Sequence, residues 1–122
     1  MKKILIVEDN KILLNMMRVF LEREGFIVEA CTSGKDAADL ILENTFDLFI
    51  VDIMLPYLNG FEVIDRIRKS EKNLSAKAMI LSSLEDDDYV RDGFDVGADA
   101  VLRKPVSPRE LVARVRHLLK GE

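Results

Sequence analysis

The sequence predicts a single α/β domain in which five parallel strands form one sheet with helices on both faces. Short apolar runs alternate five times with longer amphipathic stretches along the 122 residues, which is the pattern of a parallel sheet with crossover helices. The runs are rich in Ile, Val and Leu and lack the alternation typical of half-exposed strands. With 48% apolar residues, a chain of this length can form a core without disulfides.

The first part of the chain contains two strand-helix units. The expected strand Ile4–Val7 precedes a stretch whose apolar residues recur at helical spacing, namely Leu13, Met17, Phe20 and Leu21. The second expected strand, Ile27–Cys31, is followed by Ser33-Gly34, a signal for the start of a helix. The apolar face of that helix is formed by Ala37, Ala38, Ile41 and Leu42. Both helices can therefore cover a face of the sheet.

The third and fourth units follow the same pattern. After the expected strand Leu48–Val51, Pro56 and Asn59-Gly60 predict a turn before a helix with apolar residues at Phe61, Ile64 and Ile67. The expected strand Ala78–Leu81 leads to a helix within Asp87–Val96, where the apolar face is short and Gly93 interrupts the pattern.

The fifth unit has a well-specified helix start. The expected strand Ala100–Leu102 is followed by Ser107-Pro108-Arg109-Glu110, which gives a capping hydroxyl, a proline at the first helical position and a glutamate three residues after the cap. The apolar residues of this last helix are Leu111, Val115, Leu118 and Leu119. No repeat or linker divides the chain, so residues 1–122 are predicted to form one domain.

Composition excludes several classes of protein. The chain has 18 basic and 22 acidic residues, and a net charge of −4 gives this domain no electrostatic reason to bind nucleic acid directly. The apolar run after the first lysines is interrupted by Glu8 and Asp9, which argues against a signal peptide, and no run has membrane-spanning length. The single cysteine, Cys31, fits a reducing compartment. We therefore expect a cytoplasmic protein with no membrane contact.

Acidic residues follow two of the expected strands. Glu8 and Asp9 come after the first strand, and Asp52 comes after the third. In the flavodoxin-like strand order 2-1-3-4-5 these two strands are neighbours, which brings three carboxylates to the edge where such sheets bind ligands. At ~5 Å and an effective dielectric of ~20, each pair would repel by about 3 kcal/mol. The cluster therefore predicts a bound cation, and Mg²⁺ suits a small oxygen-ligand site.

Two further polar residues are expected at the same edge. Ser82 follows the fourth strand and Lys104 follows the fifth. With a metal ion, they would complete a site for a phosphoryl group carried on a carboxylate. A flavin or nucleotide phosphate bound directly by the first loop is disfavoured, because Glu8-Asp9-Asn10 presents anions where such a loop needs glycines or hydroxyls.

The motifs that carry these residues occur in a fixed order along the chain. They are Ile4–Asn10, Phe46–Pro56 with Asn59-Gly60, Leu81-Ser82-Ser83, Gly97-Ala98-Asp99 and Leu102–Pro105. Together they resemble the receiver domain of bacterial two-component response regulators over essentially the whole chain. The resemblance implies a phosphorylation-activated signalling switch rather than an enzyme acting on an external substrate, although such a domain takes part in its own phosphorylation and dephosphorylation.

The resemblance also implies a role for each acidic residue. Asp52 is implied to be the phosphoacceptor, which takes a phosphoryl group from a partner sensor histidine kinase, a histidine phosphotransfer protein or a small acyl phosphate. Asp9 is implied to bind Mg²⁺ directly and Glu8 through water, while Asp52 and the backbone carbonyl of Met54 complete the ligand set.

The remaining implied roles concern signal transmission. The hydroxyl of Ser82 is implied to move toward the phosphoryl oxygens, and Lys104 to bind them, with a cis bond to Pro105. The surface formed by the fourth helix, the fifth strand and the last helix would then change to control an effector domain or output protein, or to form a homodimer. The sequence leaves open whether the receiver stands alone or begins a longer regulator.

Three positions depart from the family's common pattern. Val101 stands where a tyrosine or phenylalanine is frequent, Val106 replaces a frequent phenylalanine, and Ser83 stands where alanine or glycine is usual. Val101 and Ser83 keep one alternative open, a pseudo-receiver that retains the fold as a binding scaffold without switching. The acidic run Glu85–Asp88 is expected to be a solvated helix start, with a second metal site as its alternative.

Overall fold

The computed structural model describes residues 1–55, 58–83 and 87–120, and only the backbone of residues 87–89. The turn expected at Pro56 and the first half of the acidic run Glu85–Asp88 lie outside the described residues. The elements in chain order are β1 (Lys3–Val7), α1 (Lys11–Arg23), β2 (Ile27–Cys31), α2 (Gly34–Glu43), β3 (Leu48–Asp52), α3 (Gly60–Lys69), the 3₁₀ helix η1 (Glu71–Asn73), β4 (Lys77–Ser82), α4 (Asp87–Val96), β5 (Ala100–Arg103) and α5 (Pro108–Leu119).

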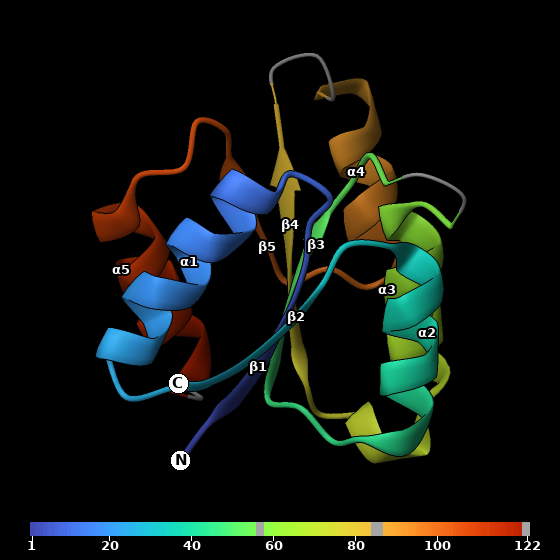
Figure 1. Cartoon of the computed structure of the whole chain (residues 1–122). Coiled ribbons are helices and arrows are strands. Elements are labelled where there is room, and N and C mark those ends of the chain that lie inside the picture. Colours follow the sequence, from blue (N-terminus) through green and yellow to red (C-terminus); the bar gives the residue numbers. More distant parts are fainter. Residues whose placement is uncertain (56–57, 84–86, 121–122) are drawn as a thin grey trace.

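The five strands form one parallel sheet in the order β2-β1-β3-β4-β5, which confirms the predicted fold. Helices α1 and α5 cover one face, and α2, α3 and α4 cover the other (Figure 1). In the register of the central strands, Val7 pairs with Val51 and Asp52 pairs with Leu81. The carboxyl ends of β1, β3 and β4 therefore lie at the same edge. None of the described helices is long and apolar enough to span a membrane.

The core lies on both faces of the three central strands. Residues of β1 alternate between the faces: Ile4 and Ile6 pack with α1 and α5, while Leu5 and Val7 pack with α2 and α3. The edge strands are less covered, and Ile27 at the start of β2 is 45% exposed. The edge strands are therefore less buried than the central strands, because an edge strand has a neighbouring strand on one side only.

One predicted apolar helix face was partly wrong. In α2, Ala37 and Ile41 are buried, whereas Leu42 is 69% exposed. Leu42 follows Ile41 directly, so it lies about 100° around the helix from it. The buried face of α2 is therefore narrower than the sequence suggested.

The predicted helix starts are confirmed by side-chain caps. Ser33 Oγ accepts a hydrogen bond from the Asp36 N–H at 3.1 Å, Asn59 Oδ1 from the Glu62 N–H at 3.1 Å, and Ser107 Oγ from the Glu110 N–H at 3.4 Å. These bonds satisfy backbone groups that have no partner within the first helical turn. The three helices therefore begin where the sequence placed them.

The helix predicted within Asp87–Val96 is present as α4, and Gly93 has a packing role in it. A Cβ at this position would collide with Cδ1 of Ile80 on β4. The glycine therefore allows α4 to lie directly on the sheet. The same residue that weakens the helical pattern in the sequence sets the position of the helix.

The sequence did not predict η1 or the role of Asn73 at its end. This side chain is buried, and its Oδ1 accepts the Phe46 N–H at 2.8 Å while Nδ2 donates to the carbonyls of Asn44 at 2.9 Å and Ile41 at 3.2 Å. These bonds tie the end of α2 and the entry of β3 to the segment before β4. They lie at the amino end of β3, away from Asp52 at its carboxyl end.

Candidate functional site

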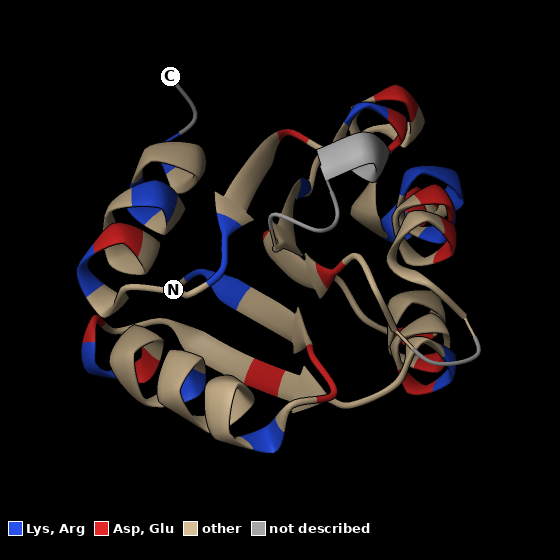
Figure 2. Ribbon diagram, turned by 90° about the horizontal axis from the view of Figure 1, so that it is seen from above, with Lys and Arg blue, Asp and Glu red and all other residues tan. Residues whose placement is uncertain are grey.

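Three carboxylates meet at the carboxyl ends of β1 and β3. Glu8, Asp9 and Asp52 each offer one oxygen within 4.8 Å of the oxygens of the other two. Glu8 and Asp52 are buried, and Asp9 is exposed. In Figure 2, which views the sheet from above, acidic segments follow the arrowheads of the central strands. The fold thus brings together the three acids singled out in the sequence.

Lys104 faces the two buried acids from the segment after β5. Its Nζ lies 3.0 Å from Glu8 Oε1 and 3.2 Å from Asp52 Oδ2. The backbone N–H of Lys104 donates to the Ser82 carbonyl at 2.7 Å, which continues the β4 and β5 pairing to this residue. Its peptide bond to Pro105 is cis, as the resemblance implied. The ammonium group therefore balances part of the negative charge of the cluster.

Backbone groups orient the two buried carboxylates. The Met54 N–H donates to Asp52 Oδ1 at 3.1 Å, and the Asn10 N–H donates to Glu8 Oε2 at 3.0 Å. Asn10 Oδ1 also accepts from the N–H groups of the first turn of α1, at Ile12 and Leu13. The orienting role of Asn10 was not predicted, although asparagine before an amphipathic stretch is a recognisable capping signal.

Gly60 allows α3 to begin close to Asp52. A Cβ on Gly60 would lie 2.5 Å from the Asp52 carbonyl oxygen, and the Gly60 N–H donates to the Ile53 carbonyl at 3.2 Å. The first residue of α3 therefore lies against the backbone at the end of β3. A larger residue here would push the end of β3 away from the helix.

Ser82 lies at the end of β4 with its side chain fully buried. Its Oγ has no hydrogen-bond partner among the described residues. Buried hydroxyls in native proteins are usually hydrogen-bonded, so one without a partner at a strand end is available for a ligand oxygen. Ser82 pairs with Arg103 of β5, which directly precedes Lys104.

Burial and charge shift two ionisation equilibria in the site. Burial raises the pKa of Glu8 to about 7, and the nearby Asp52 acts in the same direction, while the Asn10 N–H and Lys104 oppose the shift. Burial by itself lowers the pKa of Lys104, but its contacts with Glu8 and Asp52 outweigh burial and raise that pKa overall. Burial thus disfavours the ionised form of Glu8 next to Asp52, and added positive charge at the site would offset this cost.

This shift predicts how the stability of the metal-free protein depends on pH. In the unfolded chain Glu8 loses its proton near its ordinary value of 4.5, whereas the folded protein retains it up to about 7. The folded state binds more protons in this window, so the Glu8 contribution to the free energy of unfolding falls as the pH rises through it. Urea unfolding in chelator at about pH 5 and about pH 7.5 measures the effect. Glu8→Gln should remove this contribution, and an identical pH dependence for variant and wild type would contradict the assignment.

Two of the three departures from the family pattern pack on opposite faces of the sheet. Val101 of β5 is half-buried and packs against an apolar cluster formed by Ile53, Ile64, Ala78, Ile80 and Ala98. Val106 is also half-buried, but it packs against the cluster on the α1 and α5 face. A valine at position 101 therefore occupies an apolar site of the core, where it has no ring to move.

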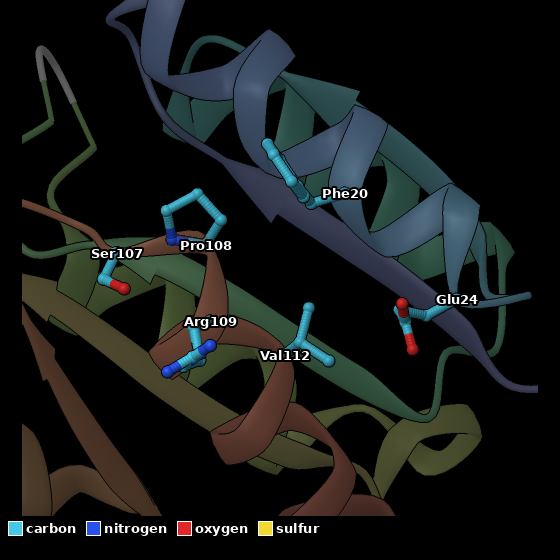
Figure 3. A pocket seen from close by; sticks show the side chains of 6 residues that line it. All are labelled: Phe20, Glu24, Ser107, Pro108, Arg109 and Val112. Carbon is cyan, nitrogen blue, oxygen red and sulfur yellow. The ribbon is translucent and has the colours of Figure 1, made fainter.

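A groove of about 510 Å³ lies between α1 and α5, apart from the acidic cluster (Figure 3). Phe20 and Glu24 come from α1, and the other lining residues are Ser107, Pro108, Arg109 and Val112. Its walls are mainly apolar, and none of the clustered carboxylates lines it. The residues able to carry phosphoryl chemistry therefore lie at the strand ends and not in this groove.

Known proteins are similar to this chain in both sequence and fold. The transcriptional regulatory protein SrrA of Staphylococcus aureus (strain NCTC 8325 / PS 47) is 35% identical over 118 residues, which are 97% of this chain and 48% of that protein. The chain thus spans about half the length of the curated relatives that it matches.

Two solved structures are also similar. The receiver domain of the Francisella response regulator 1452 is 32% identical with a TM-score of 0.87, covering 99% of this chain and 98% of that one. The chemotaxis response regulator CheY4 of Vibrio cholerae is 27% identical with a TM-score of 0.91, covering 98% of this chain and 99% of that one. The family model of the response regulator receiver domain matches residues 4–116. The chain therefore belongs to the response regulator receiver domain family, which acts in phosphorylation-dependent signalling.

Proposed function

We propose that residues 1–122 act as one receiver domain in which Asp52 accepts a phosphoryl group from a phosphohistidine of a sensor histidine kinase or a histidine phosphotransfer protein. The observation that supports this proposal is the buried Asp52 carboxylate, which lies beside two acids able to hold a metal and 3.2 Å from the ammonium of Lys104. An Asp52 oxygen attacks phosphorus, the bond from phosphorus to the histidine nitrogen breaks, and an acyl phosphate forms. The displaced histidine nitrogen keeps the electron pair of the broken bond.

The donor set of the site fits Mg²⁺. Three carboxylate oxygens lie within 4.8 Å of one another, and Mg²⁺ is bound in proteins by oxygen ligands with several retained waters. We infer that Asp9 and Asp52 bind the ion directly with the Met54 carbonyl, and Glu8 through water. When bound, the ion neutralises charge on the phosphoryl oxygens. The exposure of Asp9 gives the ion access from solvent.

Lys104 and Ser82 are proposed to bind the added phosphoryl oxygens. Lys104 Nζ already lies 3.2 Å from Asp52, and phosphorylation brings new negative oxygens to it. The Ser82 hydroxyl has no partner among the described residues and can donate to one of those oxygens. Movement of Ser82 toward Asp52 would draw in the segment that follows β4.

The output is proposed to act through the surface of α4, β5 and α5. A change of the segment after Ser82 reaches α4 first, because that segment leads directly into the helix. This surface would then control an effector domain, a separate output protein or a homodimer. We place this signalling in the cytoplasm.

Ser82→Ala is expected to remove most of the response of this surface. Beryllofluoride, a mimic of the phosphoryl group, should change amide exchange in the segment that follows β4 in the wild type, because the Ser82 hydroxyl binds the mimic. The region to compare is Leu84–Val101. Since Val101 has no ring to move, we expect the unphosphorylated protein to sample the active arrangement and the mimic to shift its population. Ser75→Ala, at an exposed serine before β4, is the control and should respond as the wild type does.

Two results would contradict this transmission model. The first is a full response of Ser82→Ala to beryllofluoride. The second is a wild-type response confined to the immediate neighbours of Asp52, which would favour the pseudo-receiver alternative.

A further inference from the structure

The side chain of Arg68, near the end of α3, joins three segments at the carboxyl end of α4. Its Nε and Nη2 donate to the Gly97 carbonyl at 2.9 and 2.8 Å, and its Nη1 donates to the Ala76 carbonyl at 2.6 Å. Nη2 also donates to Asp99 Oδ2 at 2.7 Å. The planar guanidinium thus connects α3, the residue before β4 and the segment between α4 and β5. A fork of fixed donors holds its partners more rigidly than a single bond.

Asp99 extends this connection to the sheet. Its Oδ2 accepts the Ala78 N–H of β4 at 2.8 Å, and the Asp99 N–H donates to the Ala78 carbonyl at 2.7 Å. The Arg68 and Asp99 side chains are 24% and 32% exposed, so their ion pair is partly shielded from solvent. The segment after α4 is therefore bonded both to α3 and to β4.

Gly97 allows this contact because it has no side chain. Its φ of +121° is a conformation that residues with a side chain rarely adopt, and a Cβ there would lie 2.8 Å from Arg68 Cγ. The Gly97 N–H and the Ala98 N–H close the last turn of α4 by donating to the carbonyls of Phe94 and Gly93. The helix end and its anchoring arginine are consequently in direct contact.

We propose that Arg68 is a positioning residue that anchors the carboxyl end of α4, so that phosphorylation of Asp52 turns the helix about this end. Arg68 holds Gly97 and Asp99 in place, and Gly93 lies directly against Ile80. A displacement that starts at Ser82 must therefore be accommodated by the residues between Ser82 and Gly93. The trigger rests on the proposed function, whereas the anchor exists without phosphorylation. Arg68 lies outside the acidic cluster, so it acts on the response and not on the chemistry at Asp52.

The anchor is tested first in the metal-free, unphosphorylated protein. In Arg68→Met, amide exchange at 97–99 and at Ala78 is expected to be at least about tenfold faster than in the wild type, because without the Arg68 bonds to Gly97 and Asp99 this segment opens more often and exposes its own N–H groups. Arg68→Lys should restore it only in part, since an ammonium group cannot reproduce the fork. Arg66→Met, at an exposed arginine on the same helix, is the matched control. Unchanged exchange of the β1 amides would exclude global unfolding as the cause. Unchanged exchange at 97–99 in Arg68→Met would overturn the anchoring role of Arg68.

The turning of α4 is tested by adding beryllofluoride with Mg²⁺. In the wild type and Arg66→Met, the exchange response should lie between Ser83 and Gly93 and be absent at 97–99. In Arg68→Met the exchange response should be weaker between Ser83 and Gly93 and should extend to 97–99. The rate of phosphoryl incorporation from acetyl phosphate should stay within about twofold of wild type. A purely structural role would not move the response in this way.

The outcomes separate this inference from the proposed function. A wild-type response as large at 97–99 as before Gly93, or the same distribution in Arg68→Met, overturns the anchored turning while the proposed function stands. A wild type that incorporates no phosphoryl group and does not respond to beryllofluoride contradicts the proposed function and the turning of α4 together. The exchange rates of the metal-free variants then still decide whether Arg68 is an anchor.

Discussion

Asp52→Asn is expected to abolish stable phosphoryl incorporation, with a loss of at least about a hundredfold in initial rate. An amide is a far poorer nucleophile than a carboxylate, and the buried carboxylate of Asp52, beside Lys104 and the other acids, is the group that the geometry offers for attack. The metal-free variant should unfold with equal or greater free energy than the wild type. Its substitution removes one of three crowded charges while Lys104 keeps its contact with Glu8. Labelled acetyl phosphate with Mg²⁺ measures the rate, and urea unfolding measures the stability.

The matched control for this substitution is Asp47→Asn. Asp47 lies just before β3, at the end opposite Asp52, and its Oδ2 accepts the Lys3 N–H at 2.8 Å. The same chemical change there should leave phosphoryl incorporation at the wild-type rate. Incorporation by Asp52→Asn at the wild-type rate would remove Asp52 from the role of phosphoacceptor.

Asp9→Ala is expected to erase most of the stabilisation that Mg²⁺ gives the protein. A ligand at 100 times its dissociation constant adds about 2.7 kcal/mol to the free energy of unfolding, which for a chain of this size raises the melting temperature by several degrees. Asp9 offers the one exposed carboxylate among the three clustered acids, so its loss removes a ligand without opening the core. Thermal unfolding at increasing Mg²⁺ concentrations measures the shift.

The control for this measurement is Asp39→Ala, at an exposed acid on α2 outside the cluster. It should retain the full shift. If the shift instead survives Asp9→Ala undiminished, the ion is bound elsewhere, with the acidic run Glu85–Asp88 as the next place to test. That run was expected to be a solvated helix start.

Much of the fold was predictable because several independent signals in the sequence indicate the same structure. The strand runs, the helix caps at Ser33, Asn59 and Ser107, and the order of the acidic motifs all indicate the same parallel sheet. The strand ends were predicted to within a residue, since a buried parallel strand reads as an uninterrupted apolar run. The meeting of Glu8, Asp9 and Asp52 followed from the strand order alone.

The features that were missed depend on contacts between residues distant in sequence. The capping pattern of Asn10 is local, but its N–H bond to Glu8 depends on the turn that the chain makes after β1. Asn73 and Arg68 bond to backbone carbonyls contributed by other elements, and polar residues at helix ends are most often solvated. In the sequence Gly93 indicates only a weaker helix, and its packing role is visible only in the structure, where it lies against Ile80 of β4. Helical spacing likewise could not separate the exposed Leu42 from the buried Ile41.

The central claim, that Asp52 is the phosphoacceptor and requires Mg²⁺, is tested most directly by the intact mass of the wild-type protein after incubation with acetyl phosphate. We expect one added phosphoryl group with Mg²⁺ and none in chelator. Treatment with borohydride, which reduces an acyl phosphate to an alcohol, should then mark Asp52 in peptide mapping. An unchanged mass with Mg²⁺, or a phosphoryl group mapped to another residue, would contradict the account, and a yellow purified protein would instead support a flavin-binding function.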